Sequence, residues 1–105
     1  MEGAKSLVVL LLKHSSNINI NVRNKNGKTA LNWAAEKGNR EVAEILINSG
    51  ADVRAPESLF GYTPMHTAAW YWNEGAVRLL LGKADLTTKT KQGFTAQELA
   101  EKWER

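Results

Sequence analysis

Short clusters of apolar residues alternate with polar stretches along this chain, and within each cluster the spacing is that of a helix. Val42, Ile45 and Leu46 fall on one side of a helix that the pattern predicts from about residue 41 to residue 48. Gly50 follows shortly after, where a left-handed residue ends a helix at little cost. The pattern therefore predicts short amphipathic helices.

The chain repeats itself with a period of 33 residues. The triplet at 18–20 recurs at 51–53 and 84–86, and the Gly-x-Thr triplet at 27–29 recurs at 61–63 and 93–95. The glycine triplets are 34 and 32 residues apart, because one residue is inserted before Gly61 and one is lost at a helix end. Such self-similarity indicates stacked copies of one supersecondary unit.

Each copy carries the signals of two helices followed by an extended connector. Thr63-Pro64 is a typical helix start, because threonine accepts backbone N–H bonds as N-cap and proline suits the first helical position. Thr95 occupies the same place in the last copy, and Glu98 follows it at the spacing of a capping box. Asn26-Gly27 predicts a tight turn inside the connector.

A unit of 33 residues with Thr-Pro-Met-His-Thr-Ala at 63–68 resembles the ankyrin repeat, and residues 26–54 look like an almost complete copy. The resemblance implies an all-α fold, an ankyrin-type helix-turn-helix repeat solenoid with extended hairpin-like connectors. It implies a single domain over 1–105. The domain would consist of a partial first repeat at 4–25, a second repeat at 26–57, a third at 58–90 and a partial C-terminal repeat at 91–105.

Three positions carry further structural expectations. Trp72 stands where Gly38 stands in the previous unit, and a tryptophan with positive φ is strained, so we expect this turn to differ. Trp33 lies beside the alanine pair of its repeat, and we expect it to pack between units. His66 matches the family histidine, which the resemblance implies is a structural hydrogen-bonding residue near Thr63.

Composition narrows the chemistry that is open to the chain. The 105 residues include no cysteine, which excludes disulfides, thiolate metal sites and cysteine nucleophiles. His14 and His66 are the only histidines and fall in different repeats, so we expect no metal site. The sequence has no phosphate loop, Gly-x-Ser-x-Gly motif or dinucleotide fingerprint. We therefore expect neither an enzyme nor a bound cofactor.

Large apolar side chains gather in the third repeat, at positions that the family uses for binding. The resemblance implies a concave contact surface made of connector tips and the exposed sides of the first helices. Seven apolar or aromatic residues and three lysines align with that surface: Leu59, Phe60, Tyr62, Trp70, Tyr71, Phe94 and Trp103, with Lys25, Lys28 and Lys37. Clustered aromatics flanked by charges are typical of a binding hot spot. The expected function is a non-catalytic protein–protein interaction scaffold that binds across the third and fourth repeats.

The residues leave two other functions open. The net charge is +3, and basic connector tips with interleaved aromatics suit nucleic acid or another polyanion. Alternatively, the rings pack internally and the chain is a structural spacer from a longer repeat array.

The apolar run at 7–12 bears on location and association. Its six residues are too few for a membrane span, which needs about 20, and no secretory cleavage pattern follows it. We expect no membrane contact and an intracellular, cytoplasmic protein. The run has no earlier unit to cover its outer side, which makes self-association through an uncapped N-terminal helix a further expectation.

Overall fold

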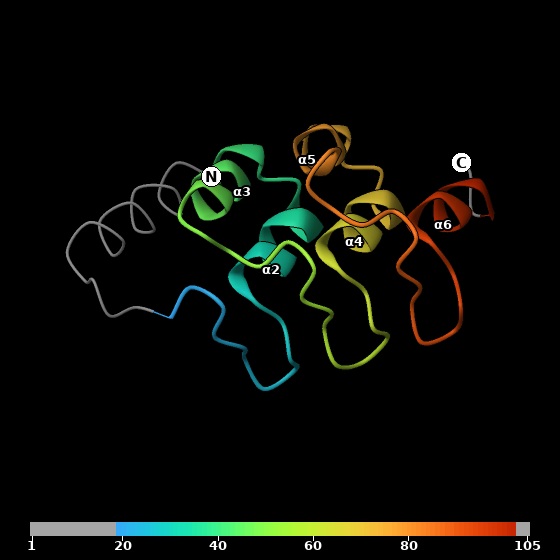
Figure 1. The fold of residues 1–105 in the computed structure, drawn as a ribbon, viewed down its shortest axis with the longest axis horizontal. Coiled ribbons are helices and arrows are strands. Elements are labelled where there is room, and N and C mark those ends of the chain that lie inside the picture. The colour runs from blue at the N-terminus through green and yellow to red at the C-terminus, as the bar shows by residue number, and fades with distance from the viewer. Residues whose placement is uncertain (1–18, 103–105) are drawn as a thin grey trace.

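A computed structural model describes residues 19–102 as short α-helices joined by turns and longer connectors (Figure 1). The helices are α2 (Ala30–Lys37), α3 (Arg40–Asn48), α4 (Pro64–Trp70), α5 (Glu74–Leu80) and α6 (Ala96–Lys102). These described residues contain no strand. The all-α fold predicted from the sequence is therefore confirmed, and α3 matches the helix expected at 41–48 within one residue.

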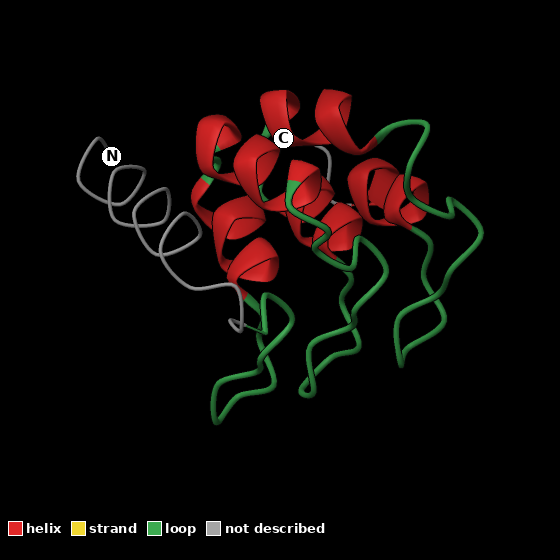
Figure 2. Ribbon diagram, turned by 60° about the vertical axis from the view of Figure 1, so that its left-hand side comes forward, coloured by secondary structure: helices red, strands yellow, loops and turns green. Residues whose placement is uncertain are grey.

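The helices form two layers. In the first layer α2 packs on α4 and α4 packs on α6, while α3 packs on α5 in the second layer. Each layer is joined to the other within a repeat, α2 to α3 and α4 to α5. The connectors leave the first layer as narrow loops on the same side of the molecule (Figure 2). The predicted repeat bounds 26–57, 58–90 and 91–105 contain α2–α3, α4–α5 and α6 respectively, and the bounds themselves stay a prediction.

Each connector closes on itself like a hairpin. A backbone N–H at the start of each tip donates to a carbonyl just beyond the glycine, at 2.8–2.9 Å, in the pairs Asn24–Lys28, Glu57–Tyr62 and Thr90–Phe94. Neighbouring tips lie so close that a Cβ on Gly27 would be 1.8 Å from Oγ of Ser58. Because φ of Gly27 is also +73°, only glycine fits at this contact between the second and third repeats.

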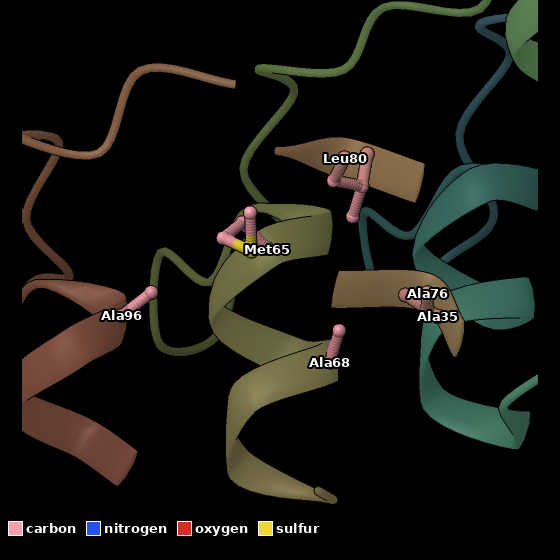
Figure 3. Packing of buried hydrophobic residues seen from close by; sticks show 6 residues of the cluster. All are labelled: Ala35, Met65, Ala68, Ala76, Leu80 and Ala96. Carbon is pink, nitrogen blue, oxygen red and sulfur yellow. The ribbon is translucent and has the colours of Figure 1, made fainter. Parts of the chain in front are cut away.

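Small side chains dominate the core. The first-layer helices α2, α4 and α6 are the inner helices. One buried cluster joins the two layers and includes residues of all three inner helices; it consists of Ala35, Met65, Ala68, Ala76, Leu80 and Ala96 (Figure 3). A second cluster between α2 and α3 consists of Leu31, Ala34, Val42, Ala43 and Leu46. Alanines let the helices approach closely, and the few large side chains supply most of the apolar burial, about 1.5–3 kcal/mol for each fully buried leucine. This packing fixes the inner helices against one another.

Threonine caps set where the inner helices begin. Thr63 accepts the N–H of His66 at 3.4 Å, and the imidazole of His66 accepts the N–H of Thr63 at 3.1 Å. In the last repeat the N–H of Thr95 donates to Glu98 at 2.9 Å, and the N–H of Glu98 donates to the Thr95 hydroxyl at 3.2 Å. The capping box predicted for Thr95 and Glu98 is therefore confirmed.

One of the two expectations about tryptophans is wrong. Trp72 adopts a φ of 56° and makes the same turn as Gly38, whose φ is 69°. The N–H of the following asparagine donates to an alanine carbonyl in both turns, at 3.0 Å for Asn39 and 2.9 Å for Asn73. The packing of the helix pair therefore imposes the left-handed conformation on tryptophan. Trp33 is 37% exposed, and the fully buried side of α2 is formed by its neighbours in sequence, so the packing of Trp33 between units stays a prediction.

Three earlier expectations concern residues outside the described range. The apolar run at 7–12, His14 and Trp103 all lie beyond residues 19–102.

Candidate functional site

A groove of about 640 Å³ lies between the connector tips and the inner helices α2 and α4. One part of its lining is apolar and aromatic: Leu59, Phe60, Tyr62, Trp70 and Tyr71. The rest is polar or charged: Lys25, Asn26, Lys28, Asn32, Glu36, Glu57, Ser58, Thr67 and Gln92. The groove thus lies between the tip of the second repeat and the tip and inner helix of the third repeat. Gln92 is the lining residue from the tip of the fourth repeat.

The aromatic rings on the apolar wall contact one another around Tyr62. Its ring centroid lies 5.8 Å from that of Phe60 and 6.5 Å from that of Trp70, the latter edge-on. The ring of His66 lies 5.9 Å away on the buried side. Such offset and edge-on pairs are the favoured arrangements of aromatic rings, and they hold the wall in one shape.

The outer members of this wall remain largely open to solvent. Leu59 is 69% exposed, Phe60 51% and Tyr71 45%. Tyr62 is half-buried beneath them, where burial first, and then the charge of Glu57, raises the pKa of its phenol. The phenol therefore stays neutral at physiological pH, and the wall offers apolar surface and neutral polar groups to a ligand.

A buried carboxylate shapes the tip of the third repeat. Glu57 is 5% exposed and accepts backbone N–H bonds from Leu59 at 2.7 Å, Phe60 at 2.8 Å and Tyr62 at 3.0 Å. Burial by itself raises the pKa of Glu57, but these hydrogen bonds together with the charge of Lys28 outweigh it and lower the pKa overall. Glu57 is therefore ionised, and it holds the aromatic tip in place.

Glu57 was not among the residues predicted from the sequence, although a signal was present. The equivalent residue of the second repeat, Asn24, accepts two N–H bonds, from Asn26 at 2.9 Å and Lys28 at 3.0 Å. In the last repeat the equivalent Thr90 accepts one, from Phe94 at 3.2 Å. The middle tip holds one residue more, and the longer glutamate side chain satisfies the additional backbone donors.

An ion pair lies on the polar side of the groove. Nζ of Lys28 is 2.8 Å from Oε1 of Glu36, and Nζ of Lys37 is 3.7 Å from Oε2 of the same carboxylate. The hydrogen bond between Lys28 and Glu36 raises the pKa of the lysine and lowers that of the glutamate. Both side chains are therefore charged and held against α2.

The structure gathers most, but not all, of the predicted binding residues. Lys25 and Lys28 line the groove with the five apolar residues of the third repeat. Lys37 lies outside the lining, paired with Glu36. Phe94 also lies outside it, with Nζ of Lys102 4.9 Å from its ring centroid. The groove therefore extends towards the second repeat more than towards the fourth.

His66 has the structural role that the sequence predicted. It is 1% exposed, and its Nδ1 accepts the N–H of Thr63. Its Nε2 must then carry the proton, which it donates to the carbonyls of Thr88 at 3.0 Å and Phe94 at 3.1 Å. Burial lowers the pKa of this imidazole, although the two carbonyls oppose the shift. One side chain thus joins the helix cap of the third repeat to the connector of the fourth.

Two other kinds of site are absent from the described residues. Within 19–102 no three histidines, aspartates or glutamates come together in a way that could hold a metal ion. In the same part of the chain, no helix has the length and apolarity needed to cross a membrane.

Stacked two-helix units with hairpin-like tips and an open groove define this chain as a solenoid repeat protein. A family model described as ankyrin repeats (3 copies) matches residues 1–91. The chain therefore belongs to the ankyrin-repeat family, as the sequence predicted, and its fold is the ankyrin-type helix-turn-helix solenoid.

Several relatives are named as regulators. The NF-kappa-B inhibitor cactus of Drosophila melanogaster is 37% identical over 84 residues, which cover 77% of this chain and 17% of that protein. The protein phosphatase 1 regulatory subunit 12A of Mus musculus is 42% identical over 78 residues, 73% of this chain and 8% of that protein. A putative ankyrin repeat protein of Rickettsia bellii is 46% identical over 61 residues, 58% of this chain and 36% of that protein.

This chain therefore spans less than a fifth of the fly and mouse relatives. Ankyrin-repeat domains are typically non-catalytic, and the fly and mouse relatives are an inhibitor and a regulatory subunit by name. Family and relatives together support a protein-interaction scaffold.

Proposed function

We propose that this chain is a non-catalytic scaffold that binds a protein partner in the groove between the connector tips and helices α2 and α4. The observation that carries the proposal is the exposure of Leu59, Phe60 and Tyr71 on one wall of that groove. Apolar side chains that stay this exposed in a contiguous patch are a feature of interaction surfaces.

The anchors would be the apolar wall, and the lysines would form its rim. Trp70 and Tyr71 lie at the end of α4, on a helix fixed by the core, so little order is lost when a partner covers them. Lys25 is exposed at the tip of the second repeat, where it would steer an approaching partner rather than anchor it. Removing a central aromatic would cost about 2–4 kcal/mol of binding.

The partner's surface should match this division of the groove. An apolar side chain suits the wall formed by Phe60, Tyr62 and Trp70, and a polar or charged group suits the Lys28–Glu36 pair opposite. A partner that covers both would bury the ion pair, which strengthens the interaction between the two charges as water is excluded.

The test compares two variants in a pull-down whose captured partner is then purified for affinity measurement. Trp70→Ala with Tyr71→Ala should weaken binding about 30- to 700-fold, the equivalent of 2–4 kcal/mol. Trp33→Ala is the matched control, because Trp33 is an exposed ring outside the groove lining. The helical circular dichroism and melting temperature should stay nearly unchanged in both variants.

Either of two results would contradict this proposal. Unchanged capture by the double variant would favour the structural spacer. Loss of helical signal in that variant would show that the two rings belong to the core and not to a contact surface.

A further inference from the structure

A second groove, of about 510 Å³, lies between the connectors and carries a different chemistry from the first. Its lining includes four exposed cations contributed by three successive connectors: Arg23, Arg54, Lys89 and Lys91. Among the described lining residues, the two grooves share only Glu57 and Ser58. The function proposed above makes no use of this basic groove.

The repeat geometry explains why these cations meet. Arg23 and Lys89 occupy equivalent positions two repeats apart, with Pro56 at the same position between them. Lys89 and Lys91 are two residues apart on the last connector, with Lys89 just before the tip and Lys91 in the turn that forms it. Because the connectors lie side by side, equivalent positions on successive connectors line one surface (Figure 2).

Two of the four cations are fixed by backbone carbonyls. The guanidinium of Arg23 donates to the carbonyl of Gly27 at 2.9 Å and also to that of Pro56 on the next connector. The ammonium of Lys91 donates to the carbonyl of Ser58. These bonds bridge adjacent connectors and leave further donors on both groups, so the groove holds its charges in place before any ligand arrives.

Protein carboxylates leave the positive charge of the groove largely uncompensated. Among the described residues, none forms an ion pair with any of the four cations. Glu57 is the one described carboxylate in the lining, and its two oxygens already accept three backbone N–H bonds. Two nearby acids sense these cations only weakly. The pKa of Asp85 is lowered mainly by hydrogen bonds from Thr87 and only last by the charge of Arg54, and the pKa of Glu98 is lowered mainly by hydrogen bonds from Thr95 and only last by the charge of Lys89.

We propose that this basic groove binds a short extended peptide segment that carries closely spaced anionic oxygens, supplied by carboxylate or phosphate side chains. Arg54 and Lys89 receive the anionic groups, and Arg23 and Lys91, which backbone carbonyls hold in place, frame them. Arginine and lysine form their strongest hydrogen bonds with charged oxygens of this kind. Threonine hydroxyls of Thr88 and Thr90 lie in the same lining and suit the neutral parts of such a peptide.

A nucleic acid fits this groove less well than a peptide. None of the described residues that line it is aromatic, whereas proteins that bind single-stranded nucleic acids combine a basic groove with aromatic rings on which the bases stack. Four aromatic residues, Phe60, Tyr62, Trp70 and Tyr71, line the other groove. Because the two grooves carry different chemistry, binding of an acidic peptide here does not depend on the partner proposed for the aromatic groove.

Fluorescence anisotropy with three labelled probes tests the proposal on the full chain: a hexaglutamate peptide, a phosphoserine-containing peptide of equal length and an oligothymidine. We expect Arg54→Gln with Lys89→Gln to weaken binding of at least one peptide about tenfold or more at about 50 mM salt. The control Lys25→Gln with Lys37→Gln removes the same amount of charge outside the groove, and it should weaken peptide binding less than about threefold. Glutamine keeps most of the aliphatic stem, and melting curves verify that each variant is folded.

The two peptides distinguish a carboxylate ligand from a phosphate ligand, and binding of either peptide supports the proposal. Equal weakening by both double variants would overturn the proposal, because it would show diffuse attraction to the net charge. Tighter binding of the oligothymidine than of both peptides would assign the groove to nucleic acid instead. The Trp70→Ala, Tyr71→Ala variant should bind the peptides normally, so failure of the aromatic site and failure of this groove are distinguishable.

Discussion

The side-chain nitrogen of Asn73 lies 2.5 Å from the carbonyl oxygen of Ala35, so a residue of the third repeat caps a helix of the second. The same nitrogen donates to the carbonyl of Glu36 at 3.1 Å. Both acceptors are in the last turn of α2, where carbonyls lack partners inside the helix. A Cβ on Gly38 would lie 2.8 Å from Oδ1 of Asn73, so this cap also requires the glycine.

Replacing Asn73 with alanine should lower the free energy of unfolding by about 1–2 kcal/mol. The change leaves two carbonyls of α2 without their donor, and unsatisfied backbone groups cost about this much. Urea denaturation followed by circular dichroism measures it. Asn48→Ala is the control, because Asn48 is exposed at the end of α3, and it should change stability by less than about 0.5 kcal/mol. Equal effects would contradict the inter-repeat cap.

Trp72→Gly should stabilise the protein by about 1 kcal/mol. Trp72 holds a φ of 56°, and a non-glycine residue in that region stores about 1–3 kcal/mol of strain. Its ring is 50% exposed, so removing it sacrifices only part of its apolar burial. Thermal melting measures the gain, and Gly38→Ala at the equivalent turn should show the opposite sign. A lower melting temperature for Trp72→Gly would mean that ring contacts outweigh the strain.

The sequence predicts the repeat architecture well because the same local signals occur in each copy. Thr63-Pro64 marks a helix start by its chemistry alone, and Thr95 with Glu98 forms the capping box that their spacing indicates. The predicted groove residues of the third repeat are likewise brought together, since their register follows from the period. Local signals of this kind do not depend on tertiary context.

What the sequence did not predict depends on how the chain packs, beyond the preferences of single residues. Trp72 violates the local preference for glycine because the helix pair around it fixes the turn. Arg54 gives no signal of binding by itself, and joins the other cations only when three connectors lie side by side. Glu57 looks like a solvated loop residue, although the insertion beside it turns it into a buried acceptor. Stacking of repeats thus explains Arg54, the packing of one helix pair explains Trp72, and the hydrogen bonds of a single tip explain Glu57.

Glu57→Gln should destabilise the chain by about 1.5–3 kcal/mol at neutral pH, because the amide offers one oxygen where the carboxylate uses two for three N–H donors. The folded-state pKa of Glu57 lies below its ordinary value of 4.5. The stabilisation of the fold by ionised Glu57 is therefore fully present above pH 4.5, and it is lost as the pH falls through the lower pKa of the folded state.

The pH dependence supplies the control for this prediction. Chemical denaturation between pH 7 and about pH 3 should show a smaller acid loss of stability in Glu57→Gln than in the wild type. The surface variant Glu44→Gln should keep the wild-type profile, because Glu44 is exposed on α3. A Glu57→Gln profile parallel to that of the wild type would show that the buried carboxylate contributes no net stability as an anion.

His66 should make the fold sensitive to mild acid, at a higher pH than the carboxylate does. The folded protein holds the imidazole neutral, with a pKa below its ordinary value of 6.5, because burial outweighs the opposing effect of the Thr88 and Phe94 carbonyls. The unfolded chain takes up a proton below pH 6.5 while the folded chain does not. The contribution of neutral His66 to the free energy of unfolding is therefore fully present above pH 6.5. Below pH 6.5 this contribution falls by up to about 1.4 kcal/mol per pH unit until the pH reaches the folded-state pKa.

His66→Asn separates this titration from the hydrogen bonds that His66 makes. Asn32 shows that asparagine serves the same position in the second repeat, since it accepts from Thr29 at 2.8 Å and donates to Ala55 at 3.2 Å. The variant should lose about 1–3 kcal/mol at neutral pH, because the smaller side chain leaves space and reaches fewer carbonyls. Its urea midpoint should then vary less between pH 7 and pH 5 than that of the wild type. An unchanged slope would mean that another group takes up the proton on unfolding.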